Sequence, residues 1–122
     1  MSFGFTEFSL VSFKPKDLLA HFKGRFFKSD RITDWHFTKK GDFHVVYLAV
    51  EHSDGRIEGW AARYSLYKRS EEFLICEDLL PEDYLVEPCC CHCPKKILDR
   101  LSPTTDKWAT EWRNRCRQNI DA

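Results

Sequence analysis

The sequence predicts an α+β fold, with an antiparallel sheet of four to five strands packed against an N-terminal helix and two C-terminal helices. The expected elements follow the order strand, helix, several strands and two helices, whereas parallel sheets need strands and helices to alternate. The 122 residues include ten Phe and four Trp, and 43% of all residues are hydrophobic, which is enough to fill one core. We therefore expect a single domain over residues 1–122.

The first elements are a strand and a helix. Residues 3–13 are rich in Phe, Val, Ser and Thr without a helical stripe, which favours an opening strand. Pro15 suits the first turn of a helix. Leu18, Phe22 and Phe26 then recur every four residues and form one apolar stripe.

The middle of the chain carries the strand patterns. Residues 35–38 form a short predicted strand that turns into residues 43–50, which are apolar on both alternating faces and so belong in the middle of a sheet. Asp54-Gly55 is a hairpin turn signal. Residues 73–76 are predicted as a further short strand after a polar turn. In the strand that follows the Asp54-Gly55 turn, alternate residues are expected to share one face of the sheet: Trp60, Ala62, Tyr64 and Leu66.

The last part of the chain predicts an irregular acidic segment and two helices. Residues 77–87 show no periodic pattern, so we expect no regular element there. Pro94 opens a short helix, and residues 102–105 separate it from the last helix. The apolar residues of the short helix are Ile97, Leu98 and Leu101. The last helix repeats apolar residues every four positions, and we expect these to face the core: Trp108, Trp112 and Cys116.

Charge and composition exclude some classes of partner. The 19 basic and 19 acidic side chains cancel, so there is no global field to attract nucleic acid or an anionic membrane. Direct binding to nucleic acid is therefore not expected. No apolar run approaches the roughly 18 residues of a membrane helix, and the first residues do not resemble a signal peptide. We expect a cytoplasmic protein without a membrane partner.

The most unusual local feature is a cluster of cysteines before the short helix. Four of the six cysteines stand at positions 89, 90, 91 and 93, too close together to crosslink the chain in pairs, which favours a reducing compartment. Thiolates are preferred ligands of zinc, and the candidate ligands are Cys89, Cys91 and Cys93. Because the sequence has no second pair of this kind, a zinc site would need remote ligands.

Two other interpretations of these thiols stay open. Free cysteines are often buried as small apolar groups, so the cluster can simply pack against the core. Cys93 also precedes Pro94 at a helix start, where the helix dipole favours a reactive thiolate. The sequence contains none of the usual local motifs of hydrolases, nucleotide-binding proteins, metalloproteases or deaminases. A binding protein is therefore expected rather than an enzyme.

The acidic segment is the predicted partner-binding surface. Residues 71–87 contain seven Asp and Glu side chains and no Lys or Arg. Such a segment suits the basic groove of a nucleic-acid-handling protein, because charge steers the encounter and apolar groups anchor it. The alternative is a solvated loop whose apolar side chains point inward. The residues predicted to contact a partner are Asp78, Glu82, Asp83, Tyr84 and Glu87.

The C-terminal sequence resembles a known family. Residues 93–104 read CPKKILDRLSPT and residues 109–117 read ATEWRNRCR. They are similar to the ending CPxxILxxLxPT followed by AxEWRxRCR in a family of small uncharacterised proteins of bacterial, phage and plasmid DNA. The resemblance covers the C-terminal part well and the rest loosely, and only Cys93 of the thiol cluster falls on its pattern. It transfers no activity, because none is established for the family.

What the resemblance implies is biological context. Small proteins of mobile elements often act by binding a host or defence protein. We therefore expect a phage or mobile-element protein that binds another protein, of the type that inhibits a host defence system such as CRISPR or restriction. The alternatives are a zinc-stabilised accessory or nucleic-acid-associated protein, and a small thiol-dependent enzyme with Cys93 as nucleophile.

Overall fold

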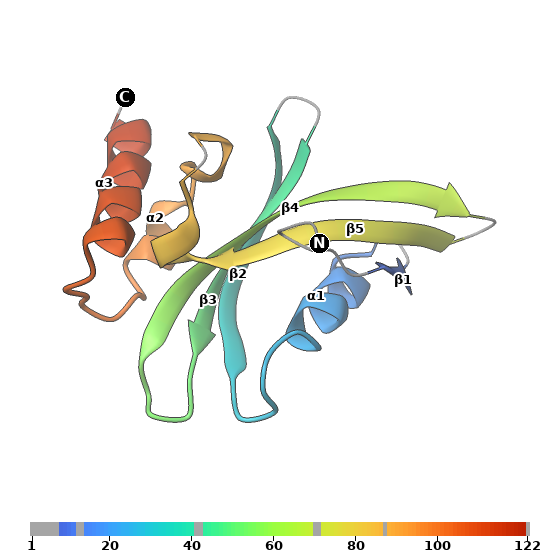
Figure 1. Cartoon of the computed structure of the whole chain (residues 1–122), viewed down its shortest axis with the longest axis horizontal. Coiled ribbons are helices and arrows are strands. Elements are labelled where there is room, and N and C mark those ends of the chain that lie inside the picture. Colours follow the sequence, from blue (N-terminus) through green and yellow to red (C-terminus); the bar gives the residue numbers. More distant parts are fainter. Residues whose placement is uncertain (1–7, 12–13, 41–42, 70–71, 87, 122) are drawn as a thin grey trace.

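The computed structural model describes residues 8–11, 14–40, 43–69, 72–86 and 88–121. Its centre is a five-stranded antiparallel sheet in the order β1-β5-β4-β3-β2 (Figure 1). The strands are β1 Phe8–Val11, β2 Arg31–Lys40, β3 Phe43–Glu51, β4 Ile57–Arg69 and β5 Glu72–Pro81. The helices are α1 Pro15–Lys23, α2 Lys95–Leu98 and α3 Lys107–Asp121, with short 3-10 turns η1 Glu82–Tyr84 and η2 Pro88–Cys90. The α+β prediction is confirmed.

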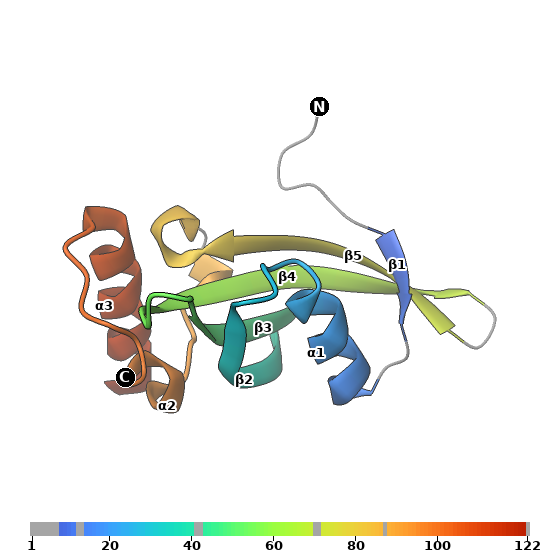
Figure 2. The same ribbon diagram turned by 90° about the horizontal axis from the view of Figure 1, so that it is seen from below.

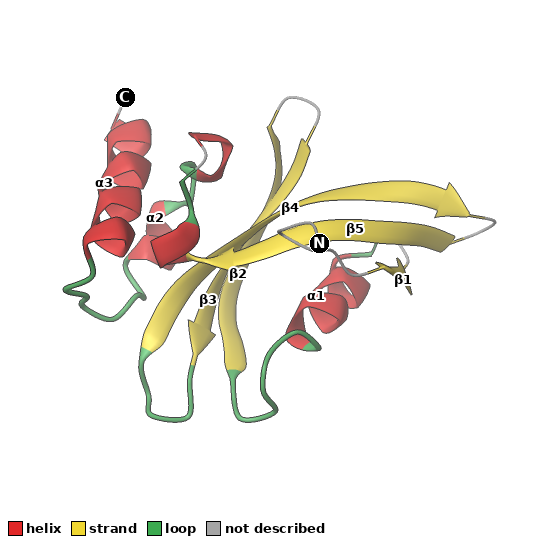
Figure 3. Cartoon of the chain, viewed as in Figure 1, coloured by secondary structure: helices red, strands yellow, loops and turns green. Residues whose placement is uncertain are grey.

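The sheet carries helices on both faces. Alternate residues of β3 point to opposite sides: Val46 and Leu48 pack against the α1 side, whereas Val45 and Tyr47 pack against the α2 and α3 side. All four are fully buried, which confirms that this strand lies inside the sheet. Helix α1 lies toward one end of the sheet, and α2 and α3 lie toward the other (Figures 2 and 3).

The predicted elements of the first half are largely confirmed. The opening strand is present as β1; the other residues predicted for it lie outside the described part of the chain. Leu18 and Phe22 are buried on α1, but the helix ends at Lys23. Phe26 therefore packs from the turn that follows, with its ring edge-on to Trp60 at 4.9 Å. The hairpin turn is also confirmed, because Gly55 has a φ of 87° that favours glycine.

Strand β5 is longer than the sequence predicts, and the expectation of an irregular segment directly after residue 76 is wrong. The strand continues to Pro81 because β4 is long enough to pair with it, with Arg63 opposite Asp78. The side chain of Glu77 is buried and forms an ion pair with Arg25, and its other carboxylate oxygen lies 3.1 Å from Nε2 of His21. Its negative charge is thus held inside the fold.

Helix α3 docks through Trp112 and not through Trp108. Trp112 is 1% exposed, and its indole N–H donates to the carbonyl of Cys90 at 2.8 Å. Its ring packs on Gly59 of β4 so closely that an added Cβ there would lie 3.0 Å from it. Trp108 is 53% exposed, so the prediction that it faces the core is wrong. The buried face of the helix consists of Ala109, Trp112 and Cys116.

None of the helices in the described part of the chain is both long and apolar enough to cross a bilayer.

Candidate functional site

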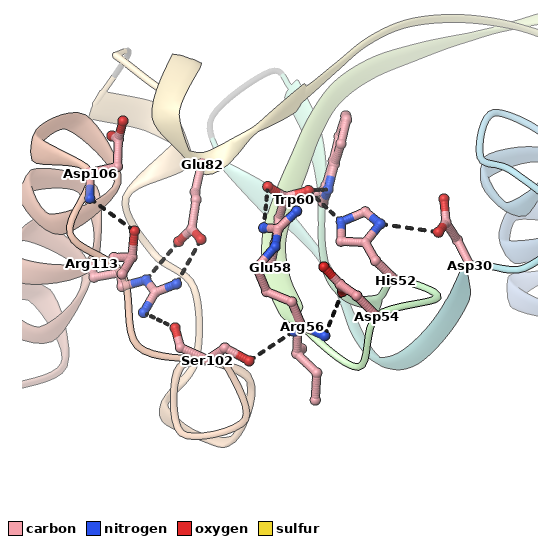
Figure 4. A network of polar contacts seen from close by, with 12 residues as sticks. Asp30, His52, Asp54, Arg56, Glu58, Trp60, Glu82, Ser102, Asp106 and Arg113 are labelled. Carbon is pink, nitrogen blue, oxygen red and sulfur yellow. Dashed lines mark hydrogen bonds and ion pairs between the residues drawn. The ribbon is translucent and has the colours of Figure 1, made fainter.

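A polar pocket of about 290 Å³ lies between the start of β4, the turn η1 and the first part of α3. Figure 4 shows the network of side chains around it. Six of its lining residues are charged, four of them acidic: Arg56, Glu58, Glu82, Asp83, Asp106 and Arg113. The pocket brings together chain segments that are far apart in sequence.

Glu82 and Arg113 form the structural base of this pocket. The guanidinium of Arg113 donates two hydrogen bonds to the Glu82 carboxylate, both at 2.7 Å, and a third to the Ser102 carbonyl at 2.7 Å. Glu82 is only 4% exposed. Buried charges need such pairing, because desolvating an unpaired one is costly. Glu82 therefore ties η1 to α3, and its charge is already paired with that of Arg113.

Asp83 lines the pocket without a comparable partner. Its Oδ1 atom is buried and has no hydrogen-bond donor among the described residues. Burial, together with the nearby carboxylates of Asp106 and Glu58, raises the pKa of Asp83 above its usual value. A cation placed in the pocket would offset the repulsion between these carboxylates.

Asp106 contributes a second carboxylate and also begins α3. Its Oδ1 accepts the backbone N–H of Ala109 at 2.8 Å, which is the hydrogen bond of a helix N-cap. The backbone N–H of Asp106 in turn donates to the hydroxyl of Thr104 at 3.1 Å. The position of this carboxylate at the pocket is therefore fixed by the start of the helix.

A chain of hydrogen bonds continues from the pocket to the turn before β2. Nε2 of His52 lies 2.6 Å from Glu58, and Nδ1 lies 3.0 Å from Asp30 (Figure 4). The indole N–H of Trp60 donates to the same Glu58 oxygen at 2.8 Å, and Arg56 lies 3.2 Å from its other oxygen. Burial disfavours a charged imidazole here, but the hydrogen bonds to Glu58 and Asp30 outweigh it and raise the pKa of His52.

This series of hydrogen bonds has the composition of a catalytic relay, but its histidine has no ring nitrogen left for a substrate. A general base needs a ring nitrogen free to take a proton from a substrate. Both nitrogens of His52 are already bonded to carboxylates. His52 therefore acts as a clamp that holds the β3–β4 hairpin against the turn before β2.

The cysteine cluster forms part of the core on the α3 side of the sheet. Cys91 is 3% exposed, and Cys93 and Cys116 are fully buried. Among the described residues, no group of three or more His, Cys, Asp or Glu side chains is placed to hold a metal ion. This arrangement favours the packing interpretation, and the zinc site of Cys89, Cys91 and Cys93 stays a prediction.

The backbone of the cysteine loop is held by side chains from the sheet and from α3. The Tyr47 hydroxyl donates to the Cys89 carbonyl at 3.3 Å, and the amide of Asn119 donates to the Cys91 carbonyl. Burial raises the pKa of Cys93 well above its usual value and that of Cys116 to about 12. Thiols of high pKa are poor nucleophiles, so this environment does not favour a catalytic Cys93.

The predicted partner-binding residues do not share one site, because they line two separate cavities. Glu82 and Asp83 line the acidic pocket, whereas Asp78 and Tyr84 line a smaller cleft of about 50 Å³ beside Arg63. Tyr84 is 64% exposed. Glu87 lies outside the described residues.

Sequence analysis missed the two other carboxylates of the pocket. Asp106 carries a local signal, because an Asp after Ser-Pro-Thr-Thr and before a helical stripe is a typical N-cap. Glu58 carries no such local signal, since a single charged residue within a strand pattern does not indicate a site.

Comparisons with family models, with curated proteins and with solved structures find no match to this chain. The family resemblance of the C-terminal segment therefore stays a prediction, and the interpretation of the site depends on its geometry.

Proposed function

We propose that the protein acts by binding another protein, and that the acidic pocket receives a Lys or Arg side chain of this partner. The observation that carries the proposal is the charge of the pocket, whose lining holds four carboxylates and two guanidinium groups. Arg113 pairs with Glu82, and Arg56 pairs with Glu58. The carboxylates of Asp83 and Asp106 therefore face the pocket without a paired cation among the described side chains.

A long basic side chain suits this pocket in shape and chemistry. Guanidinium and ammonium groups present several N–H donors, and hydrogen bonds between charged groups are about twice as strong as neutral ones. A volume of about 290 Å³ has room for the end of such a side chain. Tyr84 lines the neighbouring smaller cleft, and its exposed ring offers the kind of aromatic contact that often dominates binding energy.

For the partner, we propose a host protein of a defence system whose nucleic-acid groove presents basic side chains. Two considerations support this choice. The acidic pocket complements such a groove in charge, and the C-terminal resemblance implies a mobile-element origin. In this proposal the protein inhibits its partner by occupying the groove.

The test replaces both carboxylates while keeping the fold. Asp83→Asn and Asp106→Asn together remove two negative charges, and Asn preserves the N-cap of α3 because it caps about as well as Asp. A matched control removes two charges elsewhere on the surface, with Asp99→Asn and Asp121→Asn. Each protein is used to capture partners from a bacterial lysate, and the affinity for the captured partner is measured by calorimetry.

We expect the pocket variant to bind about tenfold or more weakly, as for the loss of a charged hydrogen bond, and the control to bind like wild type. Equal binding by both variants would overturn the assignment of the pocket. Expression of the wild-type protein should also raise the plating efficiency of a phage restricted by the host, and the pocket variant should not. Equal plating with and without the wild-type protein would reject the anti-defence role.

A further inference from the structure

A second groove of about 350 Å³ lies between α1 and β2, on the opposite face of the sheet from the acidic pocket. Its floor is apolar and its rim is basic. The floor residues are Leu19, Ile32 and Trp35, and the rim residues are Lys16, Lys23 and Arg31.

The floor offers an apolar anchor point that the fold leaves partly uncovered. Leu19 and Ile32 are partly buried against the core on this face of the sheet. Trp35 stands on β2, the edge strand of the sheet, and is 42% exposed. A half-exposed Trp beside aliphatic side chains is typical of the centre of protein interfaces.

The helical spacing of α1 places the basic rim beside this floor. Lys16, Leu19 and Lys23 follow at intervals of three and four residues, so their side chains share one face of the helix. On the strand side, Arg31 is paired with Glu51 at 2.6 Å. Lys16 forms no ion pair with any described residue. Among the described residues, Lys23 bonds only to a neutral acceptor, the carbonyl of Phe27 at 3.2 Å.

We propose that this groove binds an acidic segment of a partner protein. An apolar side chain of the segment packs on Trp35 and Ile32, and its flanking carboxylates pair with Lys16 and Lys23. Charge complementarity selects this occupant, because the two lysines at the rim are uncompensated. Single-stranded nucleic acid fits less well, since it needs several aromatic rings for successive bases, and the groove has a single Trp among aliphatic side chains.

The surface is independent of the acidic pocket and can be tested separately. The probe is a short fluorescein-labelled peptide in which Glu alternates with Leu and Phe, and binding is followed by fluorescence anisotropy. A second peptide carries Gln in place of each Glu, and a short labelled oligothymidine represents nucleic acid. Backbone amide shifts in NMR spectra locate the bound peptide.

The variants have close controls in the same chain. Trp35→Ala removes the apolar anchor. Trp108→Ala removes a Trp that is 53% exposed against 42% for Trp35 and that also lies beside a lysine, with Nζ of Lys107 5.3 Å from the ring centroid. Lys16→Glu with Lys23→Glu reverses the rim, and Lys107→Glu reverses a charge elsewhere. Circular dichroism and thermal unfolding check that each variant is folded.

We expect the Glu peptide to bind about tenfold or more weakly to Trp35→Ala and to the rim variant, and to bind the controls like wild type. Shifts should concentrate in the N-terminal helix and in the first half of β2, and the Asp83→Asn and Asp106→Asn protein should bind normally. Three results would overturn the proposal: no binding of the Glu peptide below about 1 mM, tighter binding of the oligothymidine, or equal binding by all variants. Self-association that is lost in Trp35→Ala would also overturn it, by assigning the groove to a second copy of the chain.

Discussion

Breaking the ion pair between Glu82 and Arg113 by replacing one partner should strongly destabilise the fold. Replacing Arg113 by Met removes three hydrogen bonds and leaves the carboxylate of Glu82, 4% exposed, without its cation. Removing one partner of a buried pair costs about 3–5 kcal/mol. We expect the free energy of unfolding to fall by that amount, as measured by urea denaturation.

The reverse variant and the double variant complete the cycle. Glu82→Gln should cost less, about 1–3 kcal/mol, because the side chain of Arg113 is 15% exposed and can reach water. The double variant should cost less than the sum of the two single changes, because neither charge is then left alone.

A surface pair provides the comparison. Lys95 and Asp99 lie 2.6 Å apart but are exposed, so Lys95→Met should cost no more than about 0.5 kcal/mol. If Arg113→Met also costs less than about 1 kcal/mol, the charge of Glu82 does not depend on Arg113 any more than a surface charge depends on its partner, and the proposed structural base of the pocket is refuted.

Three further predictions concern the hairpin, the pocket and the thiols. The pKa of His52 is raised, so its charged ring stabilises the folded state, and this stabilisation is lost as pH rises above about 6.5, the usual pKa of His. The temperature of thermal unfolding should therefore fall over this pH range, and His52→Asn should flatten the dependence. Asp83→Asn should raise the urea midpoint at pH 7 and raise it less in acid, since the raised pKa of Asp83 means that its buried charge destabilises the fold at neutral pH; an unchanged midpoint would contradict this. Iodoacetamide should modify Cys93 and Cys116 more than about tenfold more slowly in the native than in the unfolded protein, as seen by peptide mass mapping, whereas fast labelling of Cys93 would restore the thiol-enzyme hypothesis. Native mass spectrometry of the same sample tests the zinc hypothesis, which requires bound zinc.

The sequence by itself determined those parts of the fold that repeat locally. Six consecutive buried residues in β3, a turn with Gly55 at positive φ and the stripe of Leu18 and Phe22 all follow from patterns within a few residues. These patterns were sufficient for the α+β class and for the order of the elements.

Tertiary structure decided which charged and aromatic residues are buried. Glu77 belongs to a strand because β4 pairs with it, and its charge can be buried because Arg25, 52 positions earlier, neutralises it. Trp108 and Trp112 belong to the same four-residue repeat on α3, yet it is Trp112 that packs on Gly59, where the absence of a side chain leaves room for its ring. The spacing of residues along one helix does not indicate where the neighbouring strand carries its smallest side chain.

The candidate site divides in the same way. Sequence analysis named Glu82 and Asp83 from their acidic segment, but it could not tell that Arg113 pairs with Glu82, whereas Asp83 has no ion-pair partner among the described residues. Glu58 and Asp106 join them only because the sheet and α3 bring distant segments to one pocket. Local patterns set which residues are acidic, whereas burial and pairing, which depend on the whole fold, set which of these charges remain available for binding.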